Sequence, residues 1–204
     1  MSYSTDPITS DCYEGTTCLI NKYSITDEEK LASLEADISL IKSAQLETVD
    51  MKADFNEDDY KELHRYLLGD IYDWAGEYRT INMTKKGTKF AEYERIPELM
   101  NRCFARLKKL KYFLDTDFDE FIDELVDFYC TINHIHPFRE GNGRVQRVFI
   151  TQLVRFNGCD INFSQINTDD LMVATIHSAQ GVTDYLHDIF YRSITVVDEE
   201  QTAE

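Results

Sequence analysis

The spacing of apolar residues is the feature of this sequence that most limits its fold. In separate stretches, apolar side chains recur three and four positions apart, which places them on one face of an α-helix. The stretches with this spacing are residues 31–41, 60–74, 96–110, 118–132, 143–157, 168–179 and 183–195. Only 3 prolines occur in the 204 residues. The pattern predicts an all-α domain.

Polar residues ahead of these stretches indicate where helices begin. Thr26 followed by Glu29 is typical of a capping box, in which each side chain bonds the other residue's backbone N–H. Asn56 is expected to cap the second helix and Gly76 to end it, and Thr168 is expected to cap a later helix. The apolar stripe expected on the first helix consists of Leu31, Leu34, Ile38 and Ile41.

Residues 77–91 depart from the helical spacing. They alternate Thr and Ile and contain the turn sequence Lys85-Lys86-Gly87. Alternation of this kind around a glycine turn predicts a short β-hairpin. We expect this hairpin to form a flap beside the helical core.

Composition limits the class of protein. With 43% hydrophobic residues the chain has enough apolar side chains for one folded domain, expected at residues 13–196 with flexible ends at 1–12 and 197–204. The net charge of −17 repels phosphate backbones and anionic lipids, so neither nucleic acid nor a membrane is an expected partner. No targeting segment is apparent, and the five scattered cysteines fit reduced thiols, so a cytoplasmic location is expected.

Residues 134–147, His-Ile-His-Pro-Phe-Arg-Glu-Gly-Asn-Gly-Arg-Val-Gln-Arg, concentrate the residues that carry chemistry. Gly141 and Gly143 bracket Asn142 where a helix must begin, so backbone N–H groups can approach an anion that the helix dipole also favours. Arg144 and Arg147 lie three positions apart and therefore share a helix face, where two guanidinium groups suit a polyphosphate.

Two further residues of this segment are candidates for chemistry. Glu140 directly precedes the glycines, and a carboxylate beside phosphate oxygens is the usual protein ligand of nucleotide-bound Mg²⁺. His136 precedes Pro137, which prevents the helix from continuing, so the imidazole is a candidate general base in a loop. Phe138 is expected to anchor that loop in the core. The isolated His64, His177 and His187 are interpreted as packed or solvated side chains.

Residues 136–147 resemble the H-P-F-x-[D/E]-G-N-G-R-x-x-R motif of Fic domains, and every specified position matches. Residues 64–68, 71–79 and 89–91 are also similar to the helix before the flap and to the flap of that family. The resemblance implies a Fic fold, a helical bundle with a short β-hairpin flap over the active site. It also implies a protein adenylyltransferase, which transfers AMP from ATP to a Ser, Thr or Tyr hydroxyl of a target protein and releases pyrophosphate.

The resemblance assigns roles to individual residues. His136 would deprotonate the hydroxyl, and Glu140 would hold Mg²⁺ across the α- and β-phosphates. Asn142 would orient the α-phosphate, while Arg144 and Arg147 would bind the β- and γ-phosphates. The backbone N–H groups that would form the anion hole belong to Gly141, Asn142 and Gly143. The other residues expected to bind nucleotide are Asn133, Lys85, Asp170 and Leu171. The flap residues expected to dock the target are Met83, Lys86, Thr88 and Phe90.

Regulation in the family often uses an inhibitory [S/T]-x-x-x-E-[G/N] helix whose glutamate pairs with the second arginine of the motif. The sequence matches it once, at residues 10–15, which makes Glu14 a candidate inhibitory residue. However, Gly15 and the β-branched Thr16 and Thr17 disfavour a helix there. We therefore expect a compact toxin-type enzyme restrained by a separate small antitoxin whose glutamate reaches Arg147.

Other functions remain open. The same fold can transfer UMP, phosphorylate or remove AMP, and the chain could also be an inactive nucleotide-binding interaction module. A zinc hydrolase built on His134, His136 and Glu140 is disfavoured, because Arg144 and Arg147 would repel the metal ion.

Overall fold

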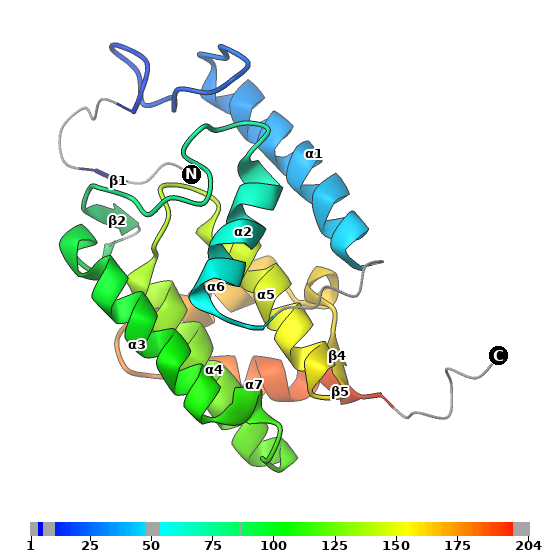
Figure 1. Cartoon of the computed structure of the whole chain (residues 1–204). Coiled ribbons are helices and arrows are strands. Elements are labelled where there is room, and N and C mark those ends of the chain that lie inside the picture. Colours follow the sequence, from blue (N-terminus) through cyan, green and yellow to red (C-terminus); the bar gives the residue numbers. More distant parts are fainter. Residues whose placement is uncertain (1–3, 6–10, 48–53, 86, 198–204) are drawn as a thin grey trace.

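The computed structural model describes residues 4–5, 11–47, 54–85 and 87–197. Most of the two expected flexible ends, and Lys86 of the flap, lie outside this set. The helices are α1 (Glu28–Glu47), α2 (Glu57–Leu68), α3 (Ile96–Lys109), α4 (Phe118–Ile135), α5 (Asn142–Phe156), α6 (Thr168–Ser178) and α7 (Asp184–Ser193). The strands are β1 (Ser4–Thr5), β2 (Met83–Lys85), β3 (Thr88–Lys89), β4 (Cys159–Ile161) and β5 (Ile194–Val196). The predicted helical fold with a small hairpin is confirmed (Figure 1).

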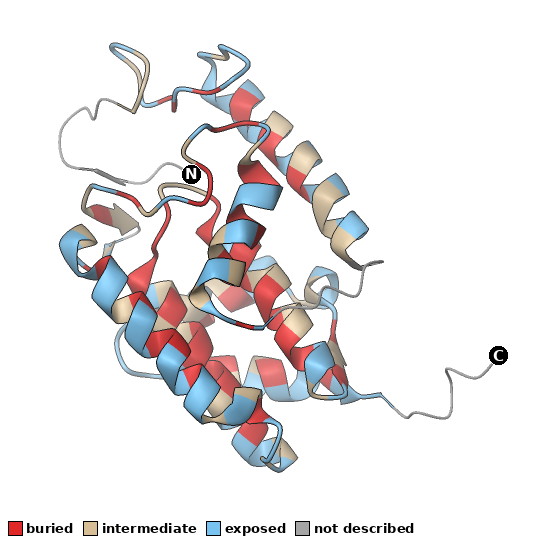
Figure 2. Ribbon diagram, in the orientation of Figure 1, coloured by how far each residue is buried: buried red, intermediate tan, exposed pale blue. Residues whose placement is uncertain are grey.

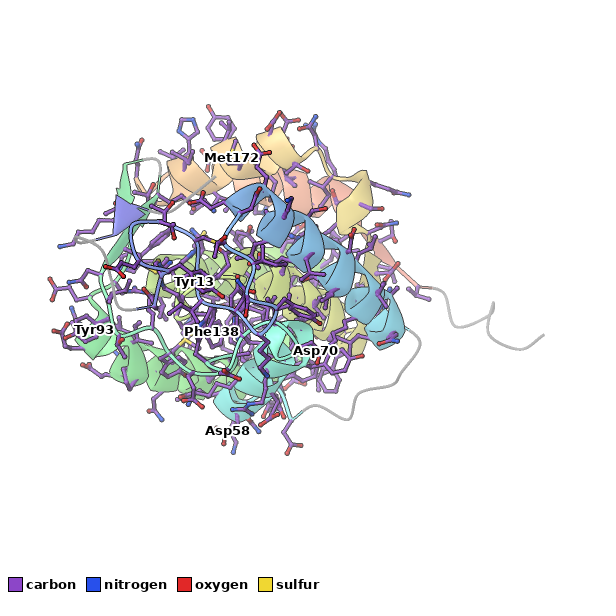
Figure 3. All side chains as sticks on the ribbon, turned by 90° about the horizontal axis from the view of Figure 1, so that it is seen from above. Tyr13, Asp58, Asp70, Tyr93, Phe138 and Met172 are labelled. Atoms are coloured by element: carbon purple, nitrogen blue, oxygen red, sulfur yellow. The ribbon has the colours of Figure 1, made fainter. Side chains whose placement is uncertain are left out.

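Helix α5 lies in the middle of the bundle and contacts α2, α4 and β4. Helices α3 and α4 pack together, α1 packs on α2, and α7 packs on both α4 and α6. Buried faces of these helices point inward in Figure 2. Phe138, in the loop between α4 and α5, is fully buried and lies inside the bundle, whereas Asp58 of α2 lies at its outer edge (Figure 3). The predicted anchoring of Phe138 in the core is thus confirmed.

The helix caps follow the expected chemistry with shifts in position. Asn56 caps α2 as predicted and forms a capping box with Asp59. The first helix is capped by Asp27, whose Oδ1 accepts from the N–H groups of Glu29 and Lys30, so the expectation that Thr26 caps it is wrong. Asn167 caps α6 in place of Thr168. At the start of both helices, the side chain of the preceding Asp27 or Asn167 accepts from the free N–H groups in place of the expected threonine.

Helix α2 ends at Leu68, eight residues before the predicted stop at Gly76. Gly69 follows, and glycine destabilises a helix because ordering its backbone costs more entropy. Ile71 and Tyr72 are buried in the turns that follow α2. The apolar spacing therefore extends beyond the end of the helix, which is why the sequence predicted a longer one.

The predicted hairpin forms between β2 and β3, with Thr84 opposite Lys89 and Lys85 opposite Thr88. Gly87 at its turn has a φ of +80°, which glycine adopts without strain. Strand β1 pairs with the other edge of β2, so the sheet has the order β1-β2-β3. Strands β4 and β5 form a second small antiparallel sheet. Neither β1 nor this second sheet was predicted, because strands of two or three residues leave too short a pattern to recognise.

None of the five cysteines forms a disulfide, in agreement with the predicted thiols. Within the described ranges, no helix combines the length and apolar character needed to cross a membrane.

Candidate active site

The central feature of the site is the loop that joins α4 to α5. His136 is the C-cap of α4, with a left-handed φ of +49°, and Pro137 follows it. A left-handed conformation is uncommon for histidine, and the proline then prevents the helix from resuming. The loop is fixed from inside by Phe138, whose ring stacks on His64 with a centroid separation of 3.8 Å.

His136 is buried and lies under the flap. The ring of Phe90 stacks on its imidazole with centroids 3.7 Å apart. Burial, reinforced by the positive charges of Lys85 and Arg79, lowers the pKa of His136 to about 3, against a smaller opposing effect of a hydrogen bond with the Asn133 backbone. A neutral imidazole can accept a proton, as a general base must. The structure thus brings Asn133, Lys85 and Phe90 to the histidine.

Arg79 ties the base of the flap to this loop. Its buried guanidinium donates to the carbonyl oxygens of His136 at 2.8 Å, Ala91 at 2.6 Å and Ile135 at 3.2 Å. Burial lowers the pKa of Arg79 to about 10, so the group stays charged at neutral pH. The sequence offered no reason to assign Arg79 this role, because its partners are scattered along the chain.

Gly141 is the N-cap of α5 and has a φ of +79°. A Cβ atom at this position would lie 2.3 Å from Leu68 Cδ1, so a larger residue would need both a strained φ and a shift of the Leu68 side chain. Asn142 and Gly143 follow in the first turn of the helix, where N–H groups have no partner within the helix. The side chain of Asn142 does not extend away from the loop: its Oδ1 accepts from the N–H of Phe138 at 2.9 Å and its Nδ2 donates to the carbonyl of Phe138 at 2.7 Å.

His64, interpreted from the sequence as a packed side chain, has a more specific place. It is fully buried, its Nδ1 accepts from the N–H of Gly76 at 2.8 Å, and its Nε2 lies 2.9 Å from the carbonyl oxygen of Glu140. These partners require the neutral tautomer with the proton on Nε2. Burial lowers the pKa of His64 to about 4. His64 therefore holds the loop at the point where the glycines begin.

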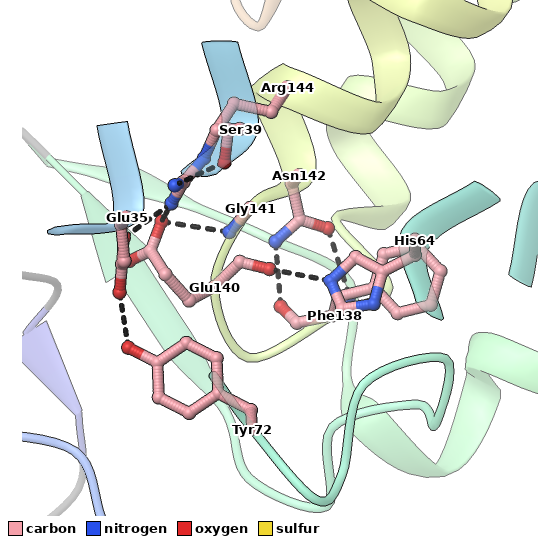
Figure 4. A network of polar contacts seen from close by, with 9 residues as sticks. All are labelled: Glu35, Ser39, His64, Tyr72, Phe138, Glu140, Gly141, Asn142 and Arg144. Atoms are coloured by element: carbon pink, nitrogen blue, oxygen red, sulfur yellow. Dashed lines mark hydrogen bonds and ion pairs between the residues drawn. The ribbon is translucent and has the colours of Figure 1, made fainter. Parts of the chain in front are cut away.

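Glu140 and Arg144 belong to a polar network that includes two residues of α1 (Figure 4). Oε1 of Glu140 accepts from the N–H of Gly141 at 2.8 Å and lies 3.3 Å from Nη2 of Arg144. The same Nη2 lies 2.6 Å from Oε2 of Glu35, and Nη1 of Arg144 donates to Ser39 at 3.2 Å. Sequence analysis singled out neither Glu35 nor Ser39. Arg144 therefore makes its contacts to carboxylates and a hydroxyl of its own chain.

Arg147 lies one turn along α5 and is partly buried. Its Nη1 would lie 3.4 Å from a Cβ atom at Gly143, which places the guanidinium beside the start of the helix. Burial lowers the pKa of Arg147. Within the described part of the chain, its side chain forms no ion pair. Glu14 lies in an exposed turn rather than a helix and forms no ion pair with Arg147.

The remaining candidates lie around this centre. In the flap, Met83 and Phe90 are buried and Thr88 is partly buried. In the first turn of α6, Asp170 is exposed and Leu171 is 8% exposed. His134 is exposed whereas His136 is buried, so the structure does not bring them together as metal ligands. No group of three or more His, Cys, Asp or Glu side chains suited to a metal ion occurs among the described residues.

Comparison with known proteins supports the same interpretation. The family model described as Fic/DOC family matches residues 54–154. A probable protein adenylyltransferase of Sinorhizobium fredii, y4lH, is 36% identical over 177 residues, which cover 86% of this chain and 89% of that protein. The chain belongs to the Fic/DOC family. Protein adenylyltransferase VbhT of Bartonella schoenbuchensis is 31% identical over 94% of this chain, but this chain covers only 40% of VbhT.

A solved structure shows the same fold. The crystal structure of the Bartonella tribocorum effector BepC, with bound AMPPNP, superposes with a TM-score of 0.86 at 25% identity and covers 92% of this chain and 97% of that one. These comparisons confirm the predicted Fic fold, the family and the nucleotidyltransferase class of enzyme. The roles of individual residues rest on the geometry above.

Proposed function

We propose that this Fic/DOC chain transfers AMP from ATP to a hydroxyl group of a target protein. The observation that carries the proposal is a neutral, buried imidazole at the end of α4 whose loop leads directly into the glycine-bracketed start of α5. A proton acceptor beside an anion-binding helix terminus is what in-line phosphoryl chemistry needs from a protein.

In the proposed reaction, one bond to the α-phosphorus forms, another breaks, and His136 takes up the proton. The target's hydroxyl oxygen attacks the α-phosphorus while its proton passes to the His136 imidazole, and the bond from the α-phosphorus to the bridging oxygen breaks to release pyrophosphate. Backbone N–H groups at Asn142 and Gly143 would receive the developing negative charge. The Asn142 side chain would act on the phosphate indirectly, by holding the loop closed. Arg147, beside Gly143, would bind the outer phosphates.

A divalent cation fits the donor set beside the helix. The Glu140 carboxylate lies directly before Gly141, and among the described residues its contacts to the N–H of Gly141 and to Arg144 both fall on Oε1, so Oε2 would be available to Mg²⁺. When bound, Mg²⁺ would neutralise phosphate charge in the transition state. The reaction consumes ATP, which favours the cytoplasm as its location.

The flap and α6 would bind the rest of the substrates. The target's extended segment would pair with the flap by strand addition, and Thr88 and Lys86 would contact that segment. Met83 and Phe90, whose side chains are buried, would hold the flap against the helical core. Lys85 would reach the nucleotide. Asp170 and Leu171 at the start of α6 would bind the adenine.

Labelled ATP tests the reaction. The purified chain is incubated with Mg²⁺, bacterial lysate and ATP labelled at the α- or the γ-phosphate, with His136→Ala as the control. A protein band that carries only the α-label, and that weakens about 10²–10⁴-fold in the variant, is expected. Label from the γ-phosphate would instead indicate phosphorylation and overturn the proposal, and UTP labelled at the α-phosphate tests the choice of base.

The proposed restraint is a separate small antitoxin whose glutamate pairs with Arg147. Two observations support it: Arg147 has no ion-pair partner among the described side chains, and Glu14 is an exposed turn residue that is not part of a helix. Purification from the native host should therefore yield a small co-eluting protein. Full activity of the chain purified there without a partner would contradict this arrangement.

A further inference from the structure

Helix α1 buries the residues that an amphipathic helix normally exposes. Glu35 is 8% exposed and Ser39 is 4% exposed, one turn apart on the same face as buried Leu31. On the outside, Leu40 is 71% exposed and Ile41 is 60% exposed. Burial of a carboxylate is costly unless the group is paired, so this orientation needs a specific cause.

The cause is Arg144, which receives the polar face of α1. Three of its N–H donors are used by its own chain, with contacts to Glu35 at 2.6 Å, Ser39 at 3.2 Å and Glu140 at 3.3 Å. The second oxygen of Glu35 accepts a hydrogen bond from the Tyr72 hydroxyl. Burial and the charge of Glu35 raise the pKa of Tyr72, so its hydroxyl stays protonated and remains a donor. Each side chain of the network thus contacts at least one other member.

The network also fixes the carboxylate proposed as the metal ligand. Arg144 and the N–H of Gly141 both contact Oε1 of Glu140, which determines how the carboxylate is turned. Two carboxylates, Glu35 and Glu140, share one guanidinium, so the cluster retains a negative charge that a cation can neutralise. Groups that orient a metal ligand contribute strongly to metal affinity.

We propose that Glu35 is a positioning residue for Glu140 and acts on it through Arg144. The inference rests on the proposed function, because it assumes that Glu140 holds the cation. It assigns Arg144 a task in addition to the phosphate binding expected from the sequence: Arg144 is also the link between α1 and Glu140. Helix α1 is then part of the active site rather than an outer support.

Nucleotide binding tests this inference without a known target. The affinity for AMPPNP is measured by calorimetry in EDTA and over a range of Mg²⁺ concentrations for the wild type, Glu35→Gln and Tyr72→Phe. Glu35→Gln should raise the Mg²⁺ concentration at half-maximal effect about 10–100-fold and leave affinity in EDTA near the wild-type value. Tyr72→Phe should shift the Mg²⁺ dependence in the same direction by less, and it replaces Glu35→Gln should that variant not melt cooperatively.

Leu31→Ala is the matched control, because it weakens the packing of α1 one turn away without touching Arg144. It should lower the melting temperature and leave the Mg²⁺ dependence unchanged. The inference is overturned by an unchanged Mg²⁺ dependence in Glu35→Gln, by an equal loss of affinity in EDTA, or by the same shift in Leu31→Ala. Wild-type binding without Mg²⁺ dependence would also overturn it. A wild type that binds AMPPNP with Mg²⁺ yet transfers no AMP would contradict the proposed function alone.

Discussion

Two of the five histidines, His64 and His136, are held neutral by burial, and this has a direct spectroscopic consequence. Their pKa values are lowered to about 4 and about 3, so both imidazoles should stay uncharged in the folded protein down to pH 5. In NMR spectra of histidine-labelled protein, two imidazole resonances should therefore not shift between pH 8 and pH 5. Spectra of His136→Ala and His64→Phe assign them. A midpoint between pH 6 and 7 for either resonance would contradict the arrangement.

His64→Phe tests how much the buried imidazole stabilises the site. Phenylalanine keeps a ring against Phe138 but leaves the N–H of Gly76 and the carbonyl of Glu140 without their partner. We expect the free energy of unfolding to fall by about 1–3 kcal/mol at pH 7 in urea titrations. His187→Gln, at a partly exposed position on α7, is the control and should change it by less than about 0.5 kcal/mol.

The same variant carries a pH signature whose sign follows from the lowered pKa. Between pH 6.5 and about 4 the unfolded chain binds a proton at residue 64 that the folded chain does not, so wild-type stability is lost as the pH falls through this window. This contribution amounts to about 1.4 kcal/mol per pH unit and is absent from His64→Phe. The difference in the free energy of unfolding between the wild type and His64→Phe should therefore become smaller as the pH falls. A gap that stays constant from pH 7 to pH 4.5 would rule out a neutral buried His64.

The start of α5 depends on a glycine for two separable reasons, and a matched pair of variants separates them. Gly141→Ala must adopt a left-handed φ and also meets Leu68, whereas Gly158→Ala has a φ of +71° with nothing within 4 Å of the new Cβ. Gly158→Ala should cost about 1–2 kcal/mol from the backbone alone. Gly141→Ala should cost more and should also abolish AMPPNP binding. Equal losses of stability in thermal melts would show that Leu68 moves aside freely.

Helix α1 shows why a correct helix can still be assigned the wrong face. The apolar spacing predicted a stripe of Leu31, Leu34, Ile38 and Ile41 toward the core, but Ile41 is 60% exposed and Glu35 is buried. The helix itself was predictable because its spacing and its cap lie within the segment. Its orientation was not, since it is decided by Arg144, which lies 109 residues away in the sequence. A hydrophobic pattern cannot reveal a buried ionic partner.

In the whole molecule too, some parts of the site could be predicted from local sequence and others could not. The chemistry-bearing residues 136–147 were predictable because they form one continuous stretch around the start of a helix. The side chains that hold this stretch in place come from distant segments: 76 residues separate His64 from Glu140, and 57 separate Arg79 from His136. Only the packing of α2, the flap and α1 around α5 brings these partners together, so no local spacing could indicate them.

The order β1-β2-β3 has a consequence for how a target reaches the flap. Ser4 and Thr5 pair with Thr84 and Met83, so the chain's own N-terminal strand occupies the edge of β2 that β3 leaves open. A target strand that adds to this edge must displace β1. Removal of residues 1–10 should therefore increase the rate of AMP transfer to a target, because the backbone groups of β2 become available for pairing.

Removal of residues 1–3 is the control for this prediction, since it shortens the chain and leaves Ser4 and Thr5 in place. Both truncated proteins keep Asp11, whose carboxylate pairs with Arg139 at 2.5 Å beside the active-site loop. The rates are compared at saturating ATP in the α-label assay, so that differences report access of the target. Equal rates for the full chain and the longer truncation would mean that the target binds elsewhere, for instance at the outer edge of β3. A faster rate with the longer truncation alone would identify the edge of β2 as the docking position and β1 as its competitor.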